Sequence, residues 1–175
     1  GRMANYESLK ELIRRLGGVV IGYSGGVDST LLARAATDAL GENAVCVLIE
    51  SALSPETEIA EATELAKDLG FNLVTVQADI FSLEKVLENG PDRCYHCKKA
   101  LFSKVIEVAR KRGLPYVLDG ANVDDEGDFR PGSRATAEMA VRSPFKELGF
   151  TKERIRAISR EVGLPTWNKP SYACL

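Results

Sequence analysis

The sequence has 175 residues, of which 45% are hydrophobic and 27% are charged, and this length and composition fit one globular domain with its own core. The formal net charge is −2, whereas nucleic-acid-binding proteins are typically strongly positive, so we expect no nucleic-acid partner. No apolar run approaches the roughly 20 residues of a membrane span and no signal peptide is recognisable, so we expect a cytoplasmic protein without a membrane partner and with reduced cysteines.

Apolar periodicity predicts strands that alternate with helices along the chain. The predicted strands cover residues 18–23, 44–49, 72–76 and 115–119. Helices are predicted over residues 5–16, 28–40, 93–112, 133–140 and 151–161. Another helix is predicted to begin with Ser54 as its cap and Pro55 as its first residue, and a short one to begin at Asp79. This alternation predicts an α/β fold, a three-layer parallel sheet with helices on both faces. Ligands of such sheets bind beyond the carboxyl ends of the strands, which gathers the loops after Tyr23, Ile49 and Asp119 into one site.

The loop after the first predicted strand, residues 24–30, reads Ser-Gly-Gly-Val-Asp-Ser-Thr and leads into a helix. The backbone N–H groups of such a turn and the positive end of the helix dipole favour an anion, above all phosphate. The glycines let the backbone approach the anion closely, and the hydroxyl groups can add donors. The candidate phosphate-binding residues are Ser24, Gly25, Gly26, Asp28, Ser29 and Thr30, with Asp28 as the helix N-cap or as a magnesium ligand. The alternative is a glycine turn that opens an ordinary helix.

This loop lacks the lysine and the spacing of G-x-x-x-x-G-K-[ST], and it is not G-x-G-x-x-G. It resembles the SGGxDS loop of the PP-loop ATP pyrophosphatases, which cleave ATP to AMP and pyrophosphate and thereby activate a carboxylate or carbonyl oxygen by adenylation. The resemblance implies an adenine nucleotide alpha hydrolase-like (HUP/PP-loop) fold, with ATP and Mg²⁺ as cofactors.

The loops after the second and fourth predicted strands hold further candidates. Glu50 and Ser51 are placed to meet the adenine, or they form a plain connection. Residues 119–128 carry five carboxylates, more than a turn needs, and hard oxygen ligands suit magnesium. The candidates in this segment are Glu126 for the metal and Gly120, Asn122 and Asp125 for ATP. The alternative is a solvated acidic loop.

Two arginines follow the acidic segment. Arg130 and Arg134 are candidate ligands of a substrate anion, because arginine is the natural bidentate partner of phosphate and carboxylate groups. They could instead be paired with the neighbouring carboxylates as surface charge.

Two sequence patterns involve cysteine. Cys94 and Cys97 have metal-ligand spacing, as in zinc sites, but they also share a helical stripe with apolar residues and could be core residues. The apolar members of that stripe are Leu101, Val105 and Val108. Cys174 lies in a loop-like segment beside basic residues, where a thiol can ionise and act as a nucleophile. On composition alone it could also be an idle cysteine.

Several collinear stretches resemble the LarE family of ATP-dependent sacrificial sulfur transferases, namely residues 24–30, 93–98, 119–125, 128–132 and 164–175. The resemblance implies a small-molecule nucleotide substrate, a pyridinium biscarboxylic acid mononucleotide, which the protein adenylates with release of pyrophosphate. Cys174 matches the position that donates its sulfur in nickel-pincer cofactor biosynthesis. Other family members hold an iron–sulfur cluster with several cysteines, and Cys174 fits either scheme. The resemblance also implies a homo-oligomer.

The same resemblance divides the chain. Residues 1–160 form the expected PP-loop ATP-binding α/β domain, and residues 161–175 form a linker that carries the candidate sulfur-donor cysteine; the C-terminal region of the family is absent. Three alternative functions stay open at this point: a tRNA thiolase, an amide-forming enzyme like NAD or GMP synthetase, and a non-catalytic ATP-binding module.

Overall fold

The computed structural model describes residues 4–52, 54–78, 93–125 and 140–170, with only the backbone for residues 93–98. In these ranges four parallel strands form one sheet, in the order β3-β2-β1-β4. The strands are β1 (Val19–Gly22), β2 (Ala44–Glu50), β3 (Asn72–Gln77) and β4 (Tyr116–Leu118), each within one residue of its predicted ends. The helices predicted from Asp79 and over residues 133–140 fall outside the described residues, except for Ala140, which lies in a turn.

The strand order reverses next to β1. The chain moves outward from β1 through β2 to β3 and then returns to the other side of β1 to form β4. Val19 of β1 is accordingly in register with Ala44 on one side and with Tyr116 on the other. The carboxyl ends of β1 and β4 therefore flank the point at which parallel α/β sheets bind their ligands.

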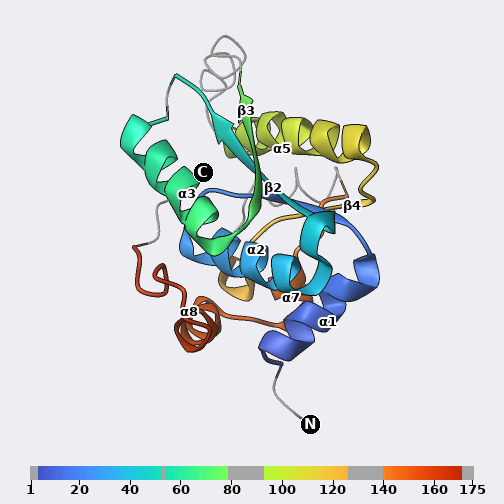
Figure 1. Cartoon of the computed structure of the whole chain (residues 1–175), viewed down its shortest axis with the longest axis vertical. Coiled ribbons are helices and arrows are strands. Elements are labelled where there is room, and N and C mark those ends of the chain that lie inside the picture. The colour runs from blue at the N-terminus through green and yellow to red at the C-terminus, as the bar shows by residue number, and fades with distance from the viewer. Residues whose placement is uncertain (1–3, 53, 79–92, 126–139, 171–175) are drawn as a thin grey trace.

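Helices cover both faces of the sheet, as predicted, and give three layers (Figure 1). One face carries α1 (Tyr6–Leu16), α2 (Val27–Leu40), α3 (Glu56–Leu69), α7 (Pro144–Leu148) and α8 (Lys152–Glu161). The other face carries α5 (Arg93–Arg112). Two short 3-10 helices, η1 (Gly41–Asn43) and η3 (Val123–Asp125), precede β2 and follow β4. In the ranges given above, no helix has both the length and the apolar character that a membrane span requires.

The inner strands are buried on both sides, because their side chains alternate between two apolar clusters. Val19 and Ile21 of β1 belong to the cluster under α1 and α2, whereas Val20 belongs to the cluster under α5. Cys46 and Val47 of β2 divide in the same way. A strand with two buried faces needs apolar residues throughout, which explains the continuous apolar run of residues 44–49.

Two predicted helix starts are wrong by one or two residues. The N-cap of α2 is Gly26, with φ −80° and ψ 179°, and Asp28 lies in the first turn. Pro55 is the N-cap of α3 rather than its first helical residue, and Ser54 Oγ accepts a hydrogen bond from Ser51 N–H at 3.1 Å instead of capping the helix. Both helices thus begin directly after an extended glycine or proline, without a side-chain cap.

The buried stripe of α5 is shifted from the predicted one. The side chains that pack on the sheet are those of Phe102, Val105 and Ala109, whereas Leu101 and Val108 are only half-buried. Phe102 lies over β1 at Gly22, where a Cβ would be 3.2 Å from its ring. The ring can approach the strand because this glycine has no side chain. The apolar periodicity of α5 cannot reveal this contact, because the glycine belongs to another element.

A short segment before α7, which the sequence patterns do not predict, runs beside β4. Leu118 and Arg142 form an isolated parallel bridge, and Asp119 N–H donates to the Arg142 carbonyl oxygen at 2.9 Å. The guanidinium of Arg142 forms an ion pair with Glu147 of α7. This segment therefore covers part of the edge of β4.

Candidate functional site

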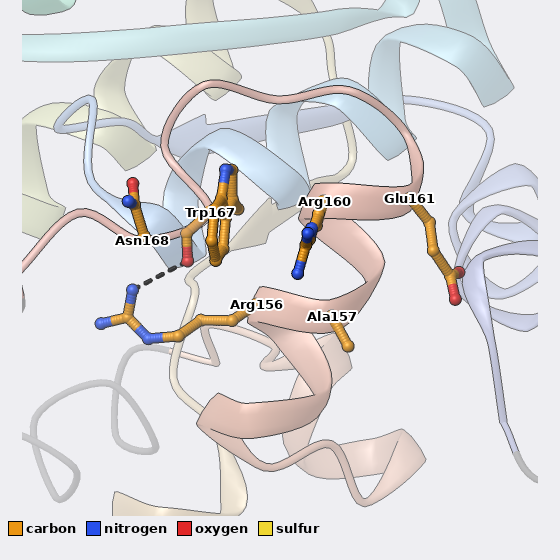
Figure 2. A pocket seen from close by; sticks show the side chains of 6 residues that line it. All are labelled: Arg156, Ala157, Arg160, Glu161, Trp167 and Asn168. Atoms are coloured by element: carbon orange, nitrogen blue, oxygen red, sulfur yellow. Dashed lines mark hydrogen bonds between the residues drawn. The ribbon is translucent and has the colours of Figure 1, made fainter.

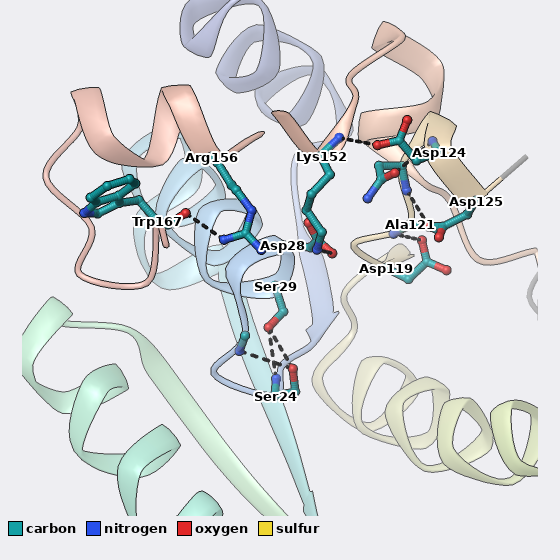
Figure 3. A network of polar contacts seen from close by, with 12 residues as sticks. Ser24, Asp28, Ser29, Asp119, Ala121, Asp124, Asp125, Lys152, Arg156 and Trp167 are labelled. Atoms are coloured by element: carbon teal, nitrogen blue, oxygen red, sulfur yellow. Dashed lines mark hydrogen bonds and ion pairs between the residues drawn. The ribbon is translucent and has the colours of Figure 1, made fainter. Parts of the chain in front are cut away.

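The glycine loop lies at the reversal of strand order, between the end of β1 and the start of α2 (Figure 3). Gly25 has φ +79°, a left-handed conformation that favours glycine. A Cβ at Gly25 would also lie 2.8 Å from the Cβ of Ala62 in α3. Both its conformation and its packing therefore require glycine at this position.

The start of α2 offers this loop backbone donors that have no acceptor within the helix. Thr30 N–H donates to the Gly26 carbonyl oxygen at 3.1 Å, which closes the first turn of the helix. The N–H groups of residues 27–29 precede this bond, so they have no acceptor within the helix. Together with the positive end of the helix dipole, these groups form the kind of site that binds anions.

Two serine hydroxyls form hydrogen bonds within the loop, whereas the hydroxyl of Thr30, a predicted phosphate contact, takes no part in them. Ser29 Oγ accepts Ser24 N–H at 3.1 Å, and the two Oγ atoms are 3.2 Å apart. Gly26 N–H lies 3.4 Å from Ser24 Oγ. Thr30 is fully buried, and its Oγ1 has no hydrogen-bond partner in the part of the chain that the structure describes. Ser24 and Ser29 are therefore the hydroxyls that shape the loop.

Asp28 faces Lys152, the first residue of α8. Lys152 Nζ is 2.6 Å from Asp28 Oδ2, and both side chains are 26% exposed. The other oxygen, Oδ1, is buried and has no hydrogen-bond partner among the described residues. Burial raises the pKa of Asp28 above its ordinary value and the charge of Asp125 adds to this effect, whereas the ammonium of Lys152 lowers the pKa. A carboxylate with one buried oxygen left without a donor fits the ligand set of a hard cation such as Mg²⁺.

The sequence patterns do not identify two lysines that the structure places at the loop. Lys152 follows Asp28 by 124 residues, so no local spacing connects them. Lys169 Nζ donates to the Gly25 carbonyl oxygen at 3.2 Å, across a separation of 144 residues. The one available signal is that Lys169 lies within the stretch of residues 164–175, which resembles a known family.

The loop after β4 packs on the start of α2, so the loops that follow Tyr23 and Asp119 lie side by side as predicted. A Cβ at Gly120 would be 3.0 Å from Asp28 Cβ and 3.3 Å from Ser29 N. This close approach places the candidate nucleotide contacts of the second loop beside the anion site of the first.

The polar groups of this second loop mainly build the loop itself. Asn122 N–H donates to Asp125 Oδ2 at 3.0 Å, and Asp124 N–H donates to Asn122 Oδ1 at 2.9 Å. Asp124 Oδ2 accepts Lys152 N–H at 2.8 Å, which ties the loop to the start of α8. Asp124 is therefore more than a solvated charge, and contacts of Asn122 and Asp125 with ATP stay predictions.

A turn after α8, residues 164–170, lies next to the glycine loop. Arg156 Nη1 donates to the Trp167 carbonyl oxygen at 2.9 Å, and the guanidinium of Arg160 lies 4.8 Å from the centre of the Trp167 ring. Figure 2 shows these side chains around an open cavity of about 730 Å³. Arg156 lies between Trp167 and Asp28 in Figure 3, and its charge lowers the pKa of Asp28. Arg156 thus supports the turn and also adds positive potential near the loop.

Glu50 is hydrogen-bonded to β3, and Ser51 is hydrogen-bonded to the segment that leads into α3. Glu50 Oε2 accepts a hydrogen bond from Gln77 Nε2 at 3.0 Å, and Ser51 Oγ is 3.3 Å from Ser54 Oγ. Glu50 ends β2 and Ser51 follows it, β1 separates β2 from β4, and the role of both residues in adenine binding stays a prediction.

The structure does not describe four of the remaining predicted residues, which are Glu126, Arg130, Arg134 and Cys174. For Cys94 and Cys97 it describes the backbone but not the side chains. Within the described residues, no three His, Cys, Asp or Glu side chains gather as a metal site. Mg²⁺ at an ATP site needs only one or two carboxylates, because phosphates and waters fill its other positions. Cys46 is buried, and burial raises the pKa of its thiol to about 12, so it is an inert core residue.

The chain has relatives among known proteins. The family model for NAD synthase matches residues 5–115. An uncharacterised protein of Synechocystis sp. is 41% identical over 170 residues, which are 97% of this chain and 63% of that protein. The pyridinium-3,5-bisthiocarboxylic acid mononucleotide synthase of Lactiplantibacillus plantarum is 39% identical over 163 residues, which are 93% of this chain and 58% of that enzyme. The chain thus spans about three-fifths of the length of these curated relatives.

One solved structure shares the fold. It is the NH3-dependent NAD synthetase from Campylobacter jejuni in complex with the nitrate ion, with a TM-score of 0.74 and 20% identity over 96% of this chain and 77% of that chain. At this identity the likeness concerns the fold alone. It confirms the predicted α/β fold of the HUP/PP-loop type.

Proposed function

The chain belongs to the NAD synthase family of the PP-loop superfamily, and on this premise we propose that it activates a substrate carboxylate with ATP in an AMP-forming sulfur transferase. The observation that carries the proposal is the glycine loop at the start of α2, where the N–H groups of residues 27–29 have no acceptor within the helix, beside Asp28 and Lys152. The 39% identity to the Lactiplantibacillus plantarum synthase supports a role in nickel-pincer cofactor biosynthesis. The proposed substrate is a pyridinium biscarboxylic acid mononucleotide.

In the proposed first step, the β- and γ-phosphates of ATP accept hydrogen bonds from the N–H groups of Gly26 and of residues 27–29. The substrate carboxylate attacks the α-phosphorus; a carboxylate oxygen–phosphorus bond forms while the bond to the bridging oxygen of pyrophosphate breaks. Negative charge builds on the leaving pyrophosphate, where fixed donors give the largest stabilisation. Lys152, held beside Asp28 at 2.6 Å, adds a positive charge at the same place.

Asp28 would hold Mg²⁺ through its buried Oδ1, the oxygen that has no partner among the described residues. When bound, the ion neutralises phosphate charge and polarises the phosphoryl group. Asp28 Oδ2 stays with Lys152, so one carboxylate would fix both positive charges relative to the loop. Glu126 is the second proposed ligand and lies outside the described residues.

In the proposed second step, the Cys174 thiolate attacks the carbonyl carbon of the acyl-adenylate, and AMP leaves with the electron pair of the broken carbon–oxygen bond. Removal of the Cys174 Cα proton then expels the sulfur with its bonding electrons. The product is a thiocarboxylate, and dehydroalanine remains at residue 174. Arg130 and Arg134 are the proposed ligands of the substrate's anionic groups.

Intact mass after turnover tests this second step. We expect the protein to lose one sulfur and two hydrogens, about 34 Da, with the loss mapped to Cys174 by peptide sequencing. The expected control is Cys174→Ser, which still releases pyrophosphate and forms the acyl-adenylate but yields no thiocarboxylate and loses no sulfur. An unchanged mass in the wild-type protein after verified thiocarboxylate formation would rule out sacrifice of this sulfur and would favour a cysteine-bound cluster.

The match to the NAD synthase family model favours one second candidate, an amide-forming enzyme. It would share the activation step, and ammonia would attack the acyl-adenylate in place of the thiolate. Cys174→Ser separates the two functions, because it would leave amide formation intact and would abolish sulfur transfer.

A further inference from the structure

We propose that Lys169 is a positioning residue that holds the Gly25–Gly26 peptide group in the orientation that turns the Gly26 N–H into the phosphate loop. The inference rests on the proposed phosphate-binding role of this loop. Its basis is the hydrogen bond of 3.2 Å from Lys169 Nζ to the Gly25 carbonyl oxygen.

The geometry of a trans peptide makes this bond directional. The C=O and N–H groups of one peptide unit point in opposite directions, and all described peptide bonds are trans. An ammonium that holds the Gly25 carbonyl oxygen on one side of the loop therefore fixes the Gly26 N–H on the other side. There the Gly26 N–H meets Ser24 Oγ at 3.4 Å, next to the Ser24–Ser29 hydroxyl pair.

Two consecutive glycines make such a restraint necessary. A flip of the Gly25–Gly26 peptide changes ψ of Gly25 and φ of Gly26 by about 180° each, which takes φ of Gly26 from −80° to about +100°. Only glycine adopts that value readily, so the sequence leaves the flipped state accessible. In the flipped state a carbonyl oxygen would replace the N–H at the anion site and would repel phosphate.

The turn after α8 holds Lys169 in place. Lys169 N–H donates to the Thr166 carbonyl oxygen at 3.0 Å, and Arg156 and Arg160 anchor Trp167 by its carbonyl group and its ring. Lys169 is half-buried, and no ion pair to a carboxylate is found for it within the described ranges. The turn therefore places the Lys169 ammonium at the Gly25 carbonyl oxygen, and the contacts within the turn do not depend on the glycine loop.

Glycine labelling gives a direct readout of this peptide. In a protein made with glycine carrying ¹³C at the carbonyl and ¹⁵N, an HNCO spectrum shows only glycines that follow a glycine, which are Gly18 and Gly26. We expect Lys169→Met to move or broaden the Gly26 signal, through the Gly25 carbonyl carbon, and to leave the Gly18 signal unchanged. Lys169→Arg and Lys169→Gln, which keep a donor, should restore the wild-type position in large part. An unchanged Gly26 signal in Lys169→Met overturns the proposal.

Calorimetric titration with pyrophosphate and Mg²⁺ then links the peptide to the anion. We expect Lys169→Met to weaken binding by about tenfold, and Lys169→Gln by less than about threefold, because the amide can donate to the carbonyl without a charge. Lys111→Met is the matched control, since it removes a lysine charge at an exposed pair with Glu107 on α5. Equal losses for Lys169→Met and Lys169→Gln would show a charge effect alone and would overturn the positioning role. Failure of the wild-type protein to bind pyrophosphate would count against the proposed function, whereas the spectrum would still decide the orientation of the peptide.

Discussion

Exchanging Asp28 for asparagine should lower the rate of pyrophosphate formation from ATP by about 10²–10³-fold, because the change removes a proposed Mg²⁺ ligand and the partner of Lys152. The amide has nearly the shape of the carboxylate, so the loop around it should keep its geometry. The measurement is the initial rate of pyrophosphate formation at saturating ATP and substrate, followed by the Mg²⁺ concentration that gives half of that rate. We expect this concentration to rise in the variant.

The stability of Asp28→Asn should separate a catalytic from a structural role. Burial raises the pKa of Asp28, so the charged form is less favourable in the folded chain than in the unfolded one. Wild-type stability therefore falls as the pH rises through the carboxyl range, and the variant escapes that loss. Against this, Lys152 loses its partner, so we expect a small net change in melting temperature. The matched control is Asp38→Asn at the other end of α2, where the carboxylate pairs with Arg34 on the surface. Equal rates for the two variants would contradict the role of Asp28.

Exchanging Gly25 for alanine should abolish ATP binding and destabilise the fold by about 2–4 kcal/mol, since it combines left-handed strain with overpacking. The backbone at Gly25 has φ +79°, and the new Cβ would lie 2.8 Å from Ala62 Cβ and 3.1 Å from Ala62 Cα. Because the obstacle includes the backbone of α3, rotation of a side chain cannot relieve it. For a chain of this size, we expect the melting temperature to fall by about 5–15 °C.

Gly17→Ala separates the two causes. Gly17 has φ +80°, nearly the same as Gly25, but a Cβ there would meet nothing within 4 Å. We expect this control to lose about 1–2 kcal/mol from strain alone and to bind ATP normally. If Gly25→Ala were no less stable than Gly17→Ala and bound ATP, the close contact between the loop and α3 would be refuted.

The architecture follows from the sequence because its local signals agree with the global fold. The run of residues 44–49 is apolar without alternation, which is what burial between two helical layers requires, and β2 forms there. The glycines of residues 24–30 likewise predict a turn before a helix, and Gly25 takes the left-handed conformation that such a turn needs. The reversal of strand order beside β1 then brings Gly120, in the predicted loop of residues 119–128, against Asp28.

The parts that could not be predicted depend on partners far apart in the chain. Lys152 and Lys169 reach the loop across more than a hundred residues, and each acts through one long, flexible side chain that leaves no periodic pattern. The core stripe of α5 is shifted because Phe102 fits over Gly22 of another element. The prediction that Asp28 caps α2 is wrong for a local reason, because the helix begins after the extended backbone of Gly26 without a side-chain cap.

We expect the glycine loop to support cleavage of ATP between the α- and β-phosphates. The most direct test incubates the full-length protein with ATP, Mg²⁺ and the pyridinium biscarboxylic acid mononucleotide, and quantifies nucleotides and phosphates together. We expect AMP and pyrophosphate in equal amounts, formed only when the carboxylate substrate is present. Formation of ADP and orthophosphate would contradict it.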